Sequence, residues 1–321
     1  METGNTNKNK IVVIGAGRVG EAVAYTLILS KRASDIVLID VDKERAEGSA
    51  LDIGHGIAFY TQATVREGDY TECADASIII ITAGMARKPG QTRLDLARSN
   101  VSIVKDITKN IMEYAEDPII IVISNPVDVL TYVVQHESGL PANRVIGTGT
   151  LLDTARFRYL LSQKCDVDIE DIDAYVLGEH GDSQVPVWSA VSIAGIPLRH
   201  YCSQLGIDIE KDMKDIDEEV KTAGSTVIQL KGATYLGIAL NTSKIVDVIL
   251  ENDNTILPVC HVIKDDVYGV SDVATSLPCV INKTGVVRTL KLPLTTQEAL
   301  AMHESSKTLK DFTQNALSVN N

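Results

Sequence analysis

The chain has 321 residues, of which 45% are hydrophobic and 23% are charged. This length and balance indicate a folded protein of about two domains and exclude a disordered chain. The net charge of −13 comes from 30 Lys and Arg against 43 Asp and Glu. Because an acidic protein repels the phosphate backbone, we expect no nucleic-acid partner, although a local cationic pocket for a small anion remains compatible with this charge.

The sequence predicts neither a membrane span nor a targeting signal. The longest uncharged stretch, residues 183–198, contains prolines and serines and is shorter than the roughly 20 apolar residues of a spanning helix. Residues 1–10 are polar, without a signal or transit pattern. The 5 cysteines are odd in number and lack a C-x-x-C spacing. We therefore expect buried thiols in the cytoplasm, and neither disulfides nor a metal site.

Apolar runs alternate with helical patterns in the first half of the chain. Continuous apolar runs are typical of strands that are buried on both faces of a parallel sheet. Residues 21–30, between the first two runs, have apolar side chains at helical spacing. The runs predicted as strands are 11–14, 36–39, 78–81 and 119–123. This rhythm predicts an α/β domain with a doubly wound parallel sheet over residues 1–150.

The second half of the chain has a different pattern. Helical spacing covers residues 210–229 and 296–316, and a short β-like run covers residues 285–290. We therefore expect a second, mixed α+β domain over residues 151–321 that contributes the substrate site. No linker rich in Ser, Gly or Pro separates the halves, so the two domains are expected to pack closely.

A glycine pattern between the first predicted strand and helix indicates a dinucleotide site. Gly15, Gly17 and Gly20 form G-x-G-x-x-G, which allows a tight turn, a close approach of a pyrophosphate and close helix–strand packing. Asp40 follows the second predicted strand, where a carboxylate binds the ribose hydroxyls of NAD and repels the extra phosphate of NADP. A Rossmann-type domain that binds NAD is therefore predicted. Arg18, inside the turn, is either a pyrophosphate contact or a solvent-exposed side chain.

Two segments of the second half contain candidate catalytic side chains. His180 lies between glycines and acids directly after the apolar run 175–177, which places it at a strand end. Asp153 and Arg156 would share one face of a helix. A carboxylate next to a histidine raises its basicity, and an arginine binds a substrate carboxylate through two hydrogen bonds. Without His180, the pair of Asp153 and Arg156 would equally fit a surface ion pair.

A cationic loop follows the third predicted strand. Arg87, Lys88 and Arg93 lie within seven residues around a Pro-Gly pair. Because ligands of open α/β sheets bind at the carboxyl ends of the strands, this loop is expected to cover an anionic substrate. A solvated charged loop is the alternative interpretation.

Taken together and in this order, the motifs resemble the lactate and malate dehydrogenase family over essentially the whole chain. The matching segments are the glycine turn 15–20, the R-K-P-G-x-x-R loop 87–93, the S-N-P segment 124–126, the L-D-x-x-R-x-R helix 152–158 and the G-E-H-G-D segment 178–182. The resemblance implies an NAD-dependent transfer of a hydride between a 2-hydroxy acid and a 2-keto acid.

The resemblance also assigns roles to the candidate residues. His180 would donate and accept the proton, with Asp153 as its orienting partner. Arg156 would bind the 1-carboxylate of the substrate, and Arg93 would polarise the reacting carbonyl. Asn125 would orient the substrate and the catalytic histidine. The pocket wall would include Thr234, and the coenzyme site would also include Val19, Thr82, Ala83, Gly84 and Asn125.

The features that distinguish lactate from malate enzymes point in two directions. Glu179, residues 147–150 and residues 187–189 are similar to lactate dehydrogenases. Arg87 stands where lactate enzymes have Gln and malate enzymes have Arg. An arginine favours a dicarboxylate, because two unit charges 4 Å apart interact by ~4 kcal/mol at an effective dielectric of 20. We expect reduction of pyruvate to L-lactate, with oxaloacetate and L-malate as the alternative pair, and measurable oxaloacetate reduction in either case.

The resemblance finally bears on regulation and assembly. Related bacterial enzymes bind fructose 1,6-bisphosphate through an Arg, which matches Arg158, and a His, whose position is Asp173 here. Because a carboxylate repels the bisphosphate, we expect weak or no activation. The family forms tetramers or dimers, and we expect a homotetramer with a dimer as the alternative.

Overall fold

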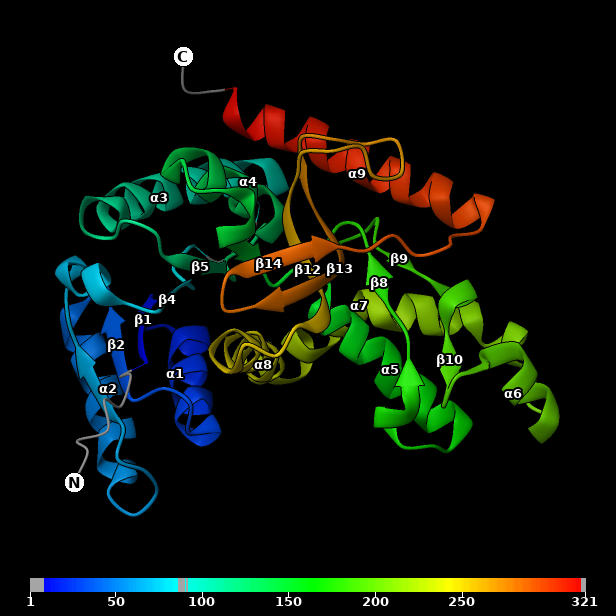
Figure 1. Ribbon diagram of the computed structural model, residues 1–321, viewed down its shortest axis with the longest axis horizontal. Coiled ribbons are helices and arrows are strands. Elements are labelled where there is room, and N and C mark those ends of the chain that lie inside the picture. Colours follow the sequence, from blue (N-terminus) through cyan, green and yellow to red (C-terminus); the bar gives the residue numbers. More distant parts are fainter. Residues whose placement is uncertain (1–8, 86–89, 91, 319–321) are drawn as a thin grey trace.

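The computed structural model of the protein describes residues 9–85, 90 and 92–318. Its strands in the first half are β1 (Lys10–Ile14), β2 (Asp35–Ile39), β3 (Thr64–Glu67), β4 (Ile78–Ile81), β5 (Ile119–Val122) and β6 (Val145–Gly147). These strands are parallel and lie side by side in the order β3-β2-β1-β4-β5-β6 (Figure 1). The predicted doubly wound sheet is confirmed.

Helices cover both faces of this sheet, which explains why its strands are apolar throughout. Ile11 and Val13 point to a core shared with α1, α2 and α8, whereas Val12 and Ile14 point to a core shared with α3, α4 and the end of α9. The bounds of these helices are α1 (Arg18–Ser30), α2 (Lys43–Ile57), α3 (Arg93–Tyr114), α4 (Val127–Ser138), α8 (Leu236–Glu251) and α9 (Thr296–Leu317). The alternating side chains of each strand therefore enter two separate cores.

The second half of the chain extends the same sheet. Its long strands are β12 (Thr255–Ile263), β13 (Val273–Asn282) and β14 (Gly285–Thr289), and they are antiparallel to one another. β12 joins β6 where Cys260 pairs with Gly147, so the order continues as β14-β13-β12-β6. The two halves of the chain thus share one nine-stranded sheet.

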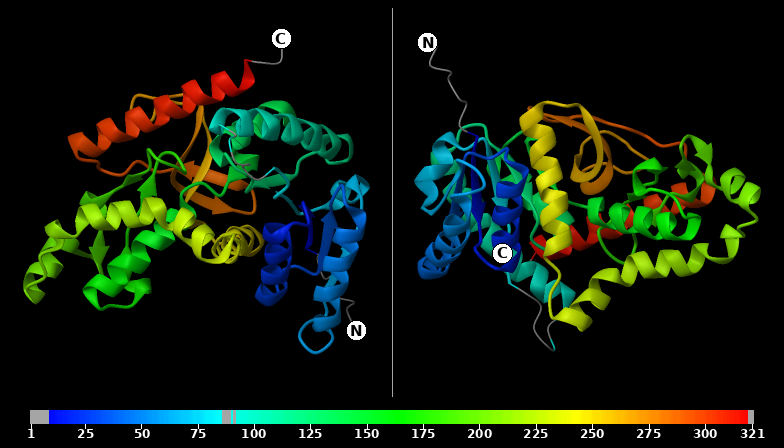
Figure 2. Two further views of the ribbon diagram at one scale, coloured as in Figure 1. Left: turned by 180° about the vertical axis from the view of Figure 1, so that it is seen from behind. Right: turned by 90° about the horizontal axis from the view of Figure 1, so that it is seen from below.

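The rest of the second half forms a smaller body with its own core, seen to the right of the sheet in Figure 1. Its helices are α5 (Leu151–Cys165), α6 (Leu198–Leu205) and α7 (Met213–Lys231). Its short strands are β7 (Ile172–Asp173), β8 (Val176–Leu177), β9 (Val185–Pro186), β10 (Ser192–Ile193) and β11 (Ile196–Pro197). The rings of Phe157 and Trp188 pack edge to face in this core, with their centroids 4.8 Å apart. α9 crosses from this body to α3 and α4 (Figure 2).

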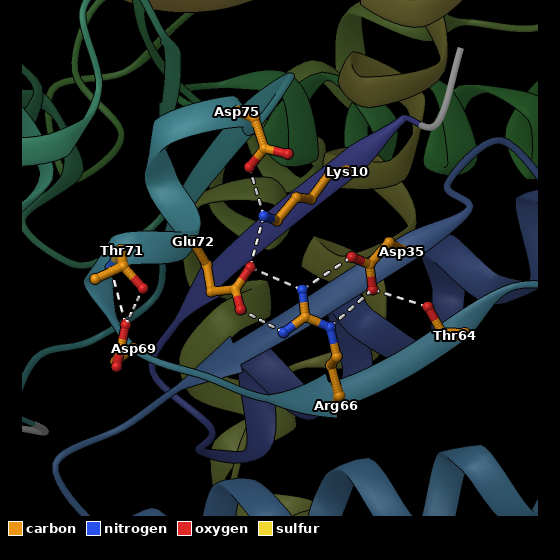
Figure 3. A network of polar contacts seen from close by, with 8 residues as sticks. All are labelled: Lys10, Asp35, Thr64, Arg66, Asp69, Thr71, Glu72 and Asp75. Carbon is orange, nitrogen blue, oxygen red and sulfur yellow. Dashed lines mark hydrogen bonds and ion pairs between the residues drawn. The ribbon is translucent and has the colours of Figure 1, made fainter. Parts of the chain in front are cut away.

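A network of ion pairs joins the amino ends of the first strands (Figure 3). Arg66 of β3 pairs with Asp35 of β2 and with Glu72, and Lys10 of β1 pairs with Glu72 and Asp75. The hydrogen bonds from Arg66 and Lys10 lower the pKa of Glu72 to about 2. Glu72 therefore connects the cations of β1 and β3.

The structure also bears on the cysteines and on a membrane location. All five cysteines are buried with free thiols, as the sequence predicted. Among the residues that the structure describes, no helix combines the length and the apolar character needed to cross a membrane.

Candidate active site

A cavity of about 820 Å³, here called the central cavity, lies at the carboxyl ends of the parallel strands. Its lining comes from the segments that follow β4, β5 and β6, and from α5, α7 and the segment around His180. Ligands of open α/β sheets bind in this place. The predicted site residues that line it are Val19, Thr82, Gly84, Arg93, Asn125, Asp153, Arg156, His180 and Thr234.

The glycine turn beside this cavity requires glycine at two positions and leaves space at the third. Gly15 has a φ of +108°, and a Cβ there would lie 2.6 Å from Thr82 Oγ1. A Cβ on Gly20 would lie 1.8 Å from the carbonyl oxygen of Gly15. A Cβ on Gly17 would meet no described atom within 4 Å. Thr82 Oγ1 donates to the carbonyl of Gly15 at 2.8 Å and so supports the turn.

Polar groups around this turn fit NAD. α1 begins after Gly17 without a side-chain cap, so its first N–H groups remain available to a pyrophosphate. Asp40 Oδ2 accepts the N–H of Ala16 at 2.6 Å, and Oδ1 accepts the N–H of Asp42 at 3.0 Å. The carboxylate is thereby fixed beside the turn, where it suits ribose hydroxyls and opposes an additional phosphate. Ala83 lies against the turn, and its N–H donates to the carbonyl of Ile14 at 2.9 Å.

The structure brings the three candidate catalytic residues of the second half together. His180 Nδ1 lies 2.6 Å from Asp153 Oδ2, and Arg156 Nη1 donates to Asp153 Oδ1 at 2.9 Å. Asp153 and Arg156 share one face of α5, and Asp153 is buried. Because Nδ1 is engaged by the carboxylate, Nε2 of His180 is the nitrogen left for a substrate.

The charges of this cluster reinforce one another. Burial alone would lower the pKa of His180, but the charge and hydrogen bond of Asp153 outweigh it and raise the pKa to about 9. Burial would likewise raise the pKa of Asp153, but His180 and Arg156 lower it below its ordinary value. His180 is therefore protonated, and Asp153 ionised, at neutral pH.

Three consecutive residues anchor the catalytic loop, defined here as residues 178–183, to three different elements. Gly178 exchanges two backbone hydrogen bonds of 3.0 Å with Ser276 of β13. The N–H of Glu179 donates to Ser305 Oγ of α9 at 2.9 Å, and the N–H of His180 donates to Asp128 Oδ2 of α4 at 2.9 Å. The position of the imidazole thus depends on elements from both halves of the chain.

Arg93 lies at the start of α3 and is engaged by the catalytic loop. Its guanidinium is 2.5 Å from Asp182 Oδ2. The hydrogen bond from Arg93 lowers the pKa of Asp182, so the pair is charged on both sides at neutral pH. Arg87, predicted to contact the substrate, and Lys88 of the same predicted cationic loop lie outside the described residues.

Several residues around the site were not predicted from the sequence. Asn100 of α3 is buried and donates to the carbonyl oxygens of Met85 and Asn125, at 3.2 and 2.7 Å. Its Oδ1 accepts the N–H of Met85 at 2.7 Å. Asp128 and Ser305 were missed as well. A buried polar residue on the apolar face of a helix is the signal that would have pointed to each of them.

Arg18 is not among the residues that line the central cavity. Arg18 is exposed and lines a separate surface hollow with Glu21 and Tyr25. Within the described ranges, no cluster of His, Cys, Asp and Glu suited to a metal ion is found.

Comparisons with known proteins show which family this chain is similar to. The family model described as lactate/malate dehydrogenase, NAD binding domain, matches residues 9–147, and the one for the alpha/beta C-terminal domain matches residues 150–319. An L-lactate dehydrogenase of Thermoanaerobacter is 47% identical over 95% of this chain and 98% of that protein. An L-lactate dehydrogenase of Priestia megaterium is 46% identical over 97% and 98%.

Solved structures agree with the sequence comparisons. The minor L-lactate dehydrogenase of Enterococcus mundtii in its ligands-bound form superposes with a TM-score of 0.94 at 42% identity, covering 98% of this chain and 99% of that one. The L-lactate dehydrogenase of Clostridium thermocellum gives a TM-score of 0.85 at 45% identity, covering 98% and 100%. The chain therefore belongs to the lactate/malate dehydrogenase family and is an NAD-dependent 2-hydroxyacid dehydrogenase.

Proposed function

We propose that the protein catalyses the reversible NADH-dependent reduction of pyruvate to L-lactate. The single observation that carries the proposal is the cluster of His180, Asp153 and Arg156 in the wall of the central cavity. It combines an acid that is protonated at neutral pH with a cation for a carboxylate. The relatives named L-lactate dehydrogenase support pyruvate as the keto acid.

Arg156 is the residue that holds the substrate carboxylate. One of its N–H donors is used by Asp153, and a guanidinium has five. The remaining donors allow a two-pronged hydrogen bond to a carboxylate in the cavity. Asn125 and Thr234, which also line the cavity, confine the rest of the molecule.

His180 moves the proton. The hydride for C2 of the keto acid would come from NADH bound at the glycine turn. As negative charge develops on the carbonyl oxygen, His180 donates its Nε2 proton to that oxygen. Its Nδ1 remains hydrogen-bonded to Asp153 throughout. In the reverse direction neutral His180 takes the hydroxyl proton. Arg93 stabilises the developing charge once its guanidinium exchanges Asp182 for the substrate oxygen.

Steady-state kinetics test this proposal directly. Pyruvate and oxaloacetate are each assayed with NADH and with NADPH. The expected result is efficient pyruvate reduction with NADH and weak activity with NADPH, because Asp40 opposes the additional phosphate. A protein that reduces no pyruvate at all, although it binds NADH, would contradict the proposal.

Arg87 supports malate dehydrogenase as the second candidate function. Its place in the family motif is the one that contacts the side chain of the substrate, and an arginine suits the second carboxylate of oxaloacetate. We expect measurable oxaloacetate reduction by the wild type and its loss in Arg87→Gln, with pyruvate reduction retained. A kcat/KM for oxaloacetate near zero beside strong pyruvate turnover would mean that Arg87 does not face the substrate.

The organisation of the molecule is part of the proposal. We assign the coenzyme-binding domain to residues 1–150 and the catalytic domain, which contains Asp153, Arg156 and His180, to residues 151–321. The five buried free thiols favour the cytoplasm. A homotetramer, or alternatively a dimer, is the expected assembly.

A further inference from the structure

Ser305 of α9 joins both sides of the catalytic loop, although it lies far from the central cavity residues in sequence. Its side chain is completely buried. Ser305 Oγ accepts the N–H of Glu179 at 2.9 Å and lies 3.0 Å from Ser183 Oγ. Glu179 and Ser183 stand on either side of His180. One hydroxyl group thus contacts the residue before the histidine and a residue three positions after it.

A ring of hydrogen bonds closes through these three residues. Ser183 donates to Glu179 Oε2 twice, from its hydroxyl at 2.5 Å and from its N–H at 3.0 Å. Because an ionised carboxylate only accepts, the hydroxyl proton of Ser183 belongs to that bond. The contact between the two hydroxyl groups is therefore a donation from Ser305 to Ser183. Ser305 both accepts and donates, which an alanine cannot reproduce.

The loop also approaches α9 very closely at Gly178. Gly178 has a φ of +85°, and a Cβ there would lie 2.6 Å from Ser305 Oγ. The backbone of the loop at Gly178 therefore packs directly against the side chain of Ser305. α9 itself packs on α3 and α4 as well as on β13 and β9 (Figure 1). A hydroxyl on this helix fixes the loop relative to elements of both halves.

We propose that Ser305 is a positioning residue for the dehydrogenase reaction, which sets the imidazole of His180 against Asp153 by holding Glu179 and Ser183. This inference rests on the function proposed above. Without the hydroxyl group of Ser305, the catalytic loop loses two hydrogen bonds to α9. The loop then no longer holds His180 at hydrogen-bond distance, 2.6 Å, from Asp153. Arg156 belongs to α5 and takes no part in the ring.

Kinetics separate positioning from a merely structural role. In Ser305→Ala, kcat for pyruvate is expected to fall roughly 10- to 100-fold, the range for a small misplacement of a catalytic group. KM is expected to change little, because Arg156 is unaffected. Ser306→Ala is the matched control, since Ser306 is an equally buried neighbour on α9 for which the described residues provide no side-chain hydrogen bond. Its kcat should stay within twofold of the wild type.

The pKa of His180, measured by NMR of isotope-labelled histidine, is the second readout. It is expected to fall in Ser305→Ala, because the imidazole loses contact with the carboxylate that raises it. The other charged groups facing His180 are Arg156 on α5 and Asp128 on α4, and neither is altered. This readout needs no substrate, so it decides the role of Ser305 even in a protein that fails to reduce pyruvate.

Ser183→Ala serves as a second variant, because it removes the hydroxyl group that joins Glu179 to Ser305 in the same ring. It should lower kcat and the pKa of His180 in the same direction. The double variant should be no worse than Ser305→Ala alone, because one ring is lost in each case. A folded Ser305→Ala with the wild-type kcat and His180 pKa would overturn the proposal. For a Ser305→Ala protein that does not fold, unchanged values in Ser183→Ala would do so.

Discussion

In the proposed reaction, the protonation state of the His180 imidazole determines whether the site favours reduction or oxidation. With a pKa of about 9, His180 is an acid at neutral pH, as reduction of a keto acid requires. Reduction should therefore be independent of pH below this value and should decline as the pH rises through 9. Oxidation of the hydroxy acid needs the neutral imidazole and should rise over the same interval.

Asp153→Asn tests the origin of this pKa. Without the carboxylate charge, burial dominates and the pKa of His180 falls, so the decline of pyruvate reduction should move to lower pH. The rate at neutral pH should fall by about 10²-fold or more, because the imidazole is then mostly neutral and its tautomer is no longer fixed. The measurement is the pH dependence of kcat/KM.

The matched control lies at the other end of the same helix. Asp166 caps α5 with a φ of 51°, is exposed, and can be replaced by Asn, which tolerates this conformation. Asp166→Asn should leave the profile unchanged. A profile of Asp153→Asn that coincides with that of the wild type would refute the assigned role of the carboxylate.

Local spacing made some site residues predictable and left others out of reach. Asp153 and Arg156 stand one helical turn apart, and His180 follows an apolar run, so short patterns pointed to each of them. Asp128 and Ser305 contact the catalytic loop from α4 and α9, 52 and 126 positions away in the chain. Such contacts are set by tertiary packing. The sequence offers only a polar residue on an otherwise apolar helix face, which does not say what that residue contacts.

At the scale of elements, buried apolar runs identified β1, β2, β4 and β5, because helices cover both sheet faces. The half-buried β3 and the three-residue β6 were not predicted. The antiparallel extension could not be foreseen in the same way. β12 and β13 are as buried as the parallel strands, but their apolar runs are interrupted, by Pro258 and His261 in β12 and by Ser276 and Pro278 in β13. Their union with β6 depends on a single pairing of Cys260 with Gly147.

The surface formed by α5 and β7 should not respond to fructose 1,6-bisphosphate. Arg158 Nε donates to the carbonyl of Ala174 at 3.0 Å, and its guanidinium lies 5.4 Å from the ring centre of Tyr175. Asp173 is exposed on β7 and repels phosphate. The KM for pyruvate should change less than about twofold on adding the sugar, in line with the small energies of exposed charges. Asp173→His should increase the response, and a large fall in the wild-type KM would contradict the assignment.

The ion-pair network at the amino ends of β1, β2 and β3 should contribute to stability through Glu72 (Figure 3). Glu72→Gln leaves Arg66 and Lys10 without their shared carboxylate and should lower the free energy of unfolding by about 2 kcal/mol. Asp75→Asn is the matched control, because this partner of Lys10 is 75% exposed and its pair is worth about 0–1 kcal/mol. Urea unfolding measures both.

The pH dependence gives this prediction a sign. Because the folded pKa of Glu72 is about 2 against an ordinary 4.5, its contribution is complete above pH 4.5 and is lost as the pH falls toward 2. The difference between wild type and Glu72→Gln should therefore be constant near neutral pH and shrink below 4.5. An equal loss in both variants would argue against a special role of Glu72.

At the scale of the whole molecule, exposed apolar side chains gather on two helices that pack side by side, α1 and α8. Tyr25 and Leu29 of α1 and Leu236 and Leu240 of α8 are 54%, 42%, 56% and 64% exposed. Apolar side chains grouped in this way are typical of a surface that another protein covers. We expect a second copy of the chain to cover this surface, because a two-fold axis would bury the same helices of both copies.

Sedimentation velocity tests this assembly. We expect the wild type to sediment as a tetramer, or as a dimer if only one interface forms. Leu240→Glu places a charge in the apolar surface and should shift the protein toward smaller species. Leu300→Glu on α9 is the matched control, because Leu300 is 63% exposed and lies outside the surface of α1 and α8. A wild type that sediments as a monomer, or an equal effect of both variants, would rule out this surface as the interface.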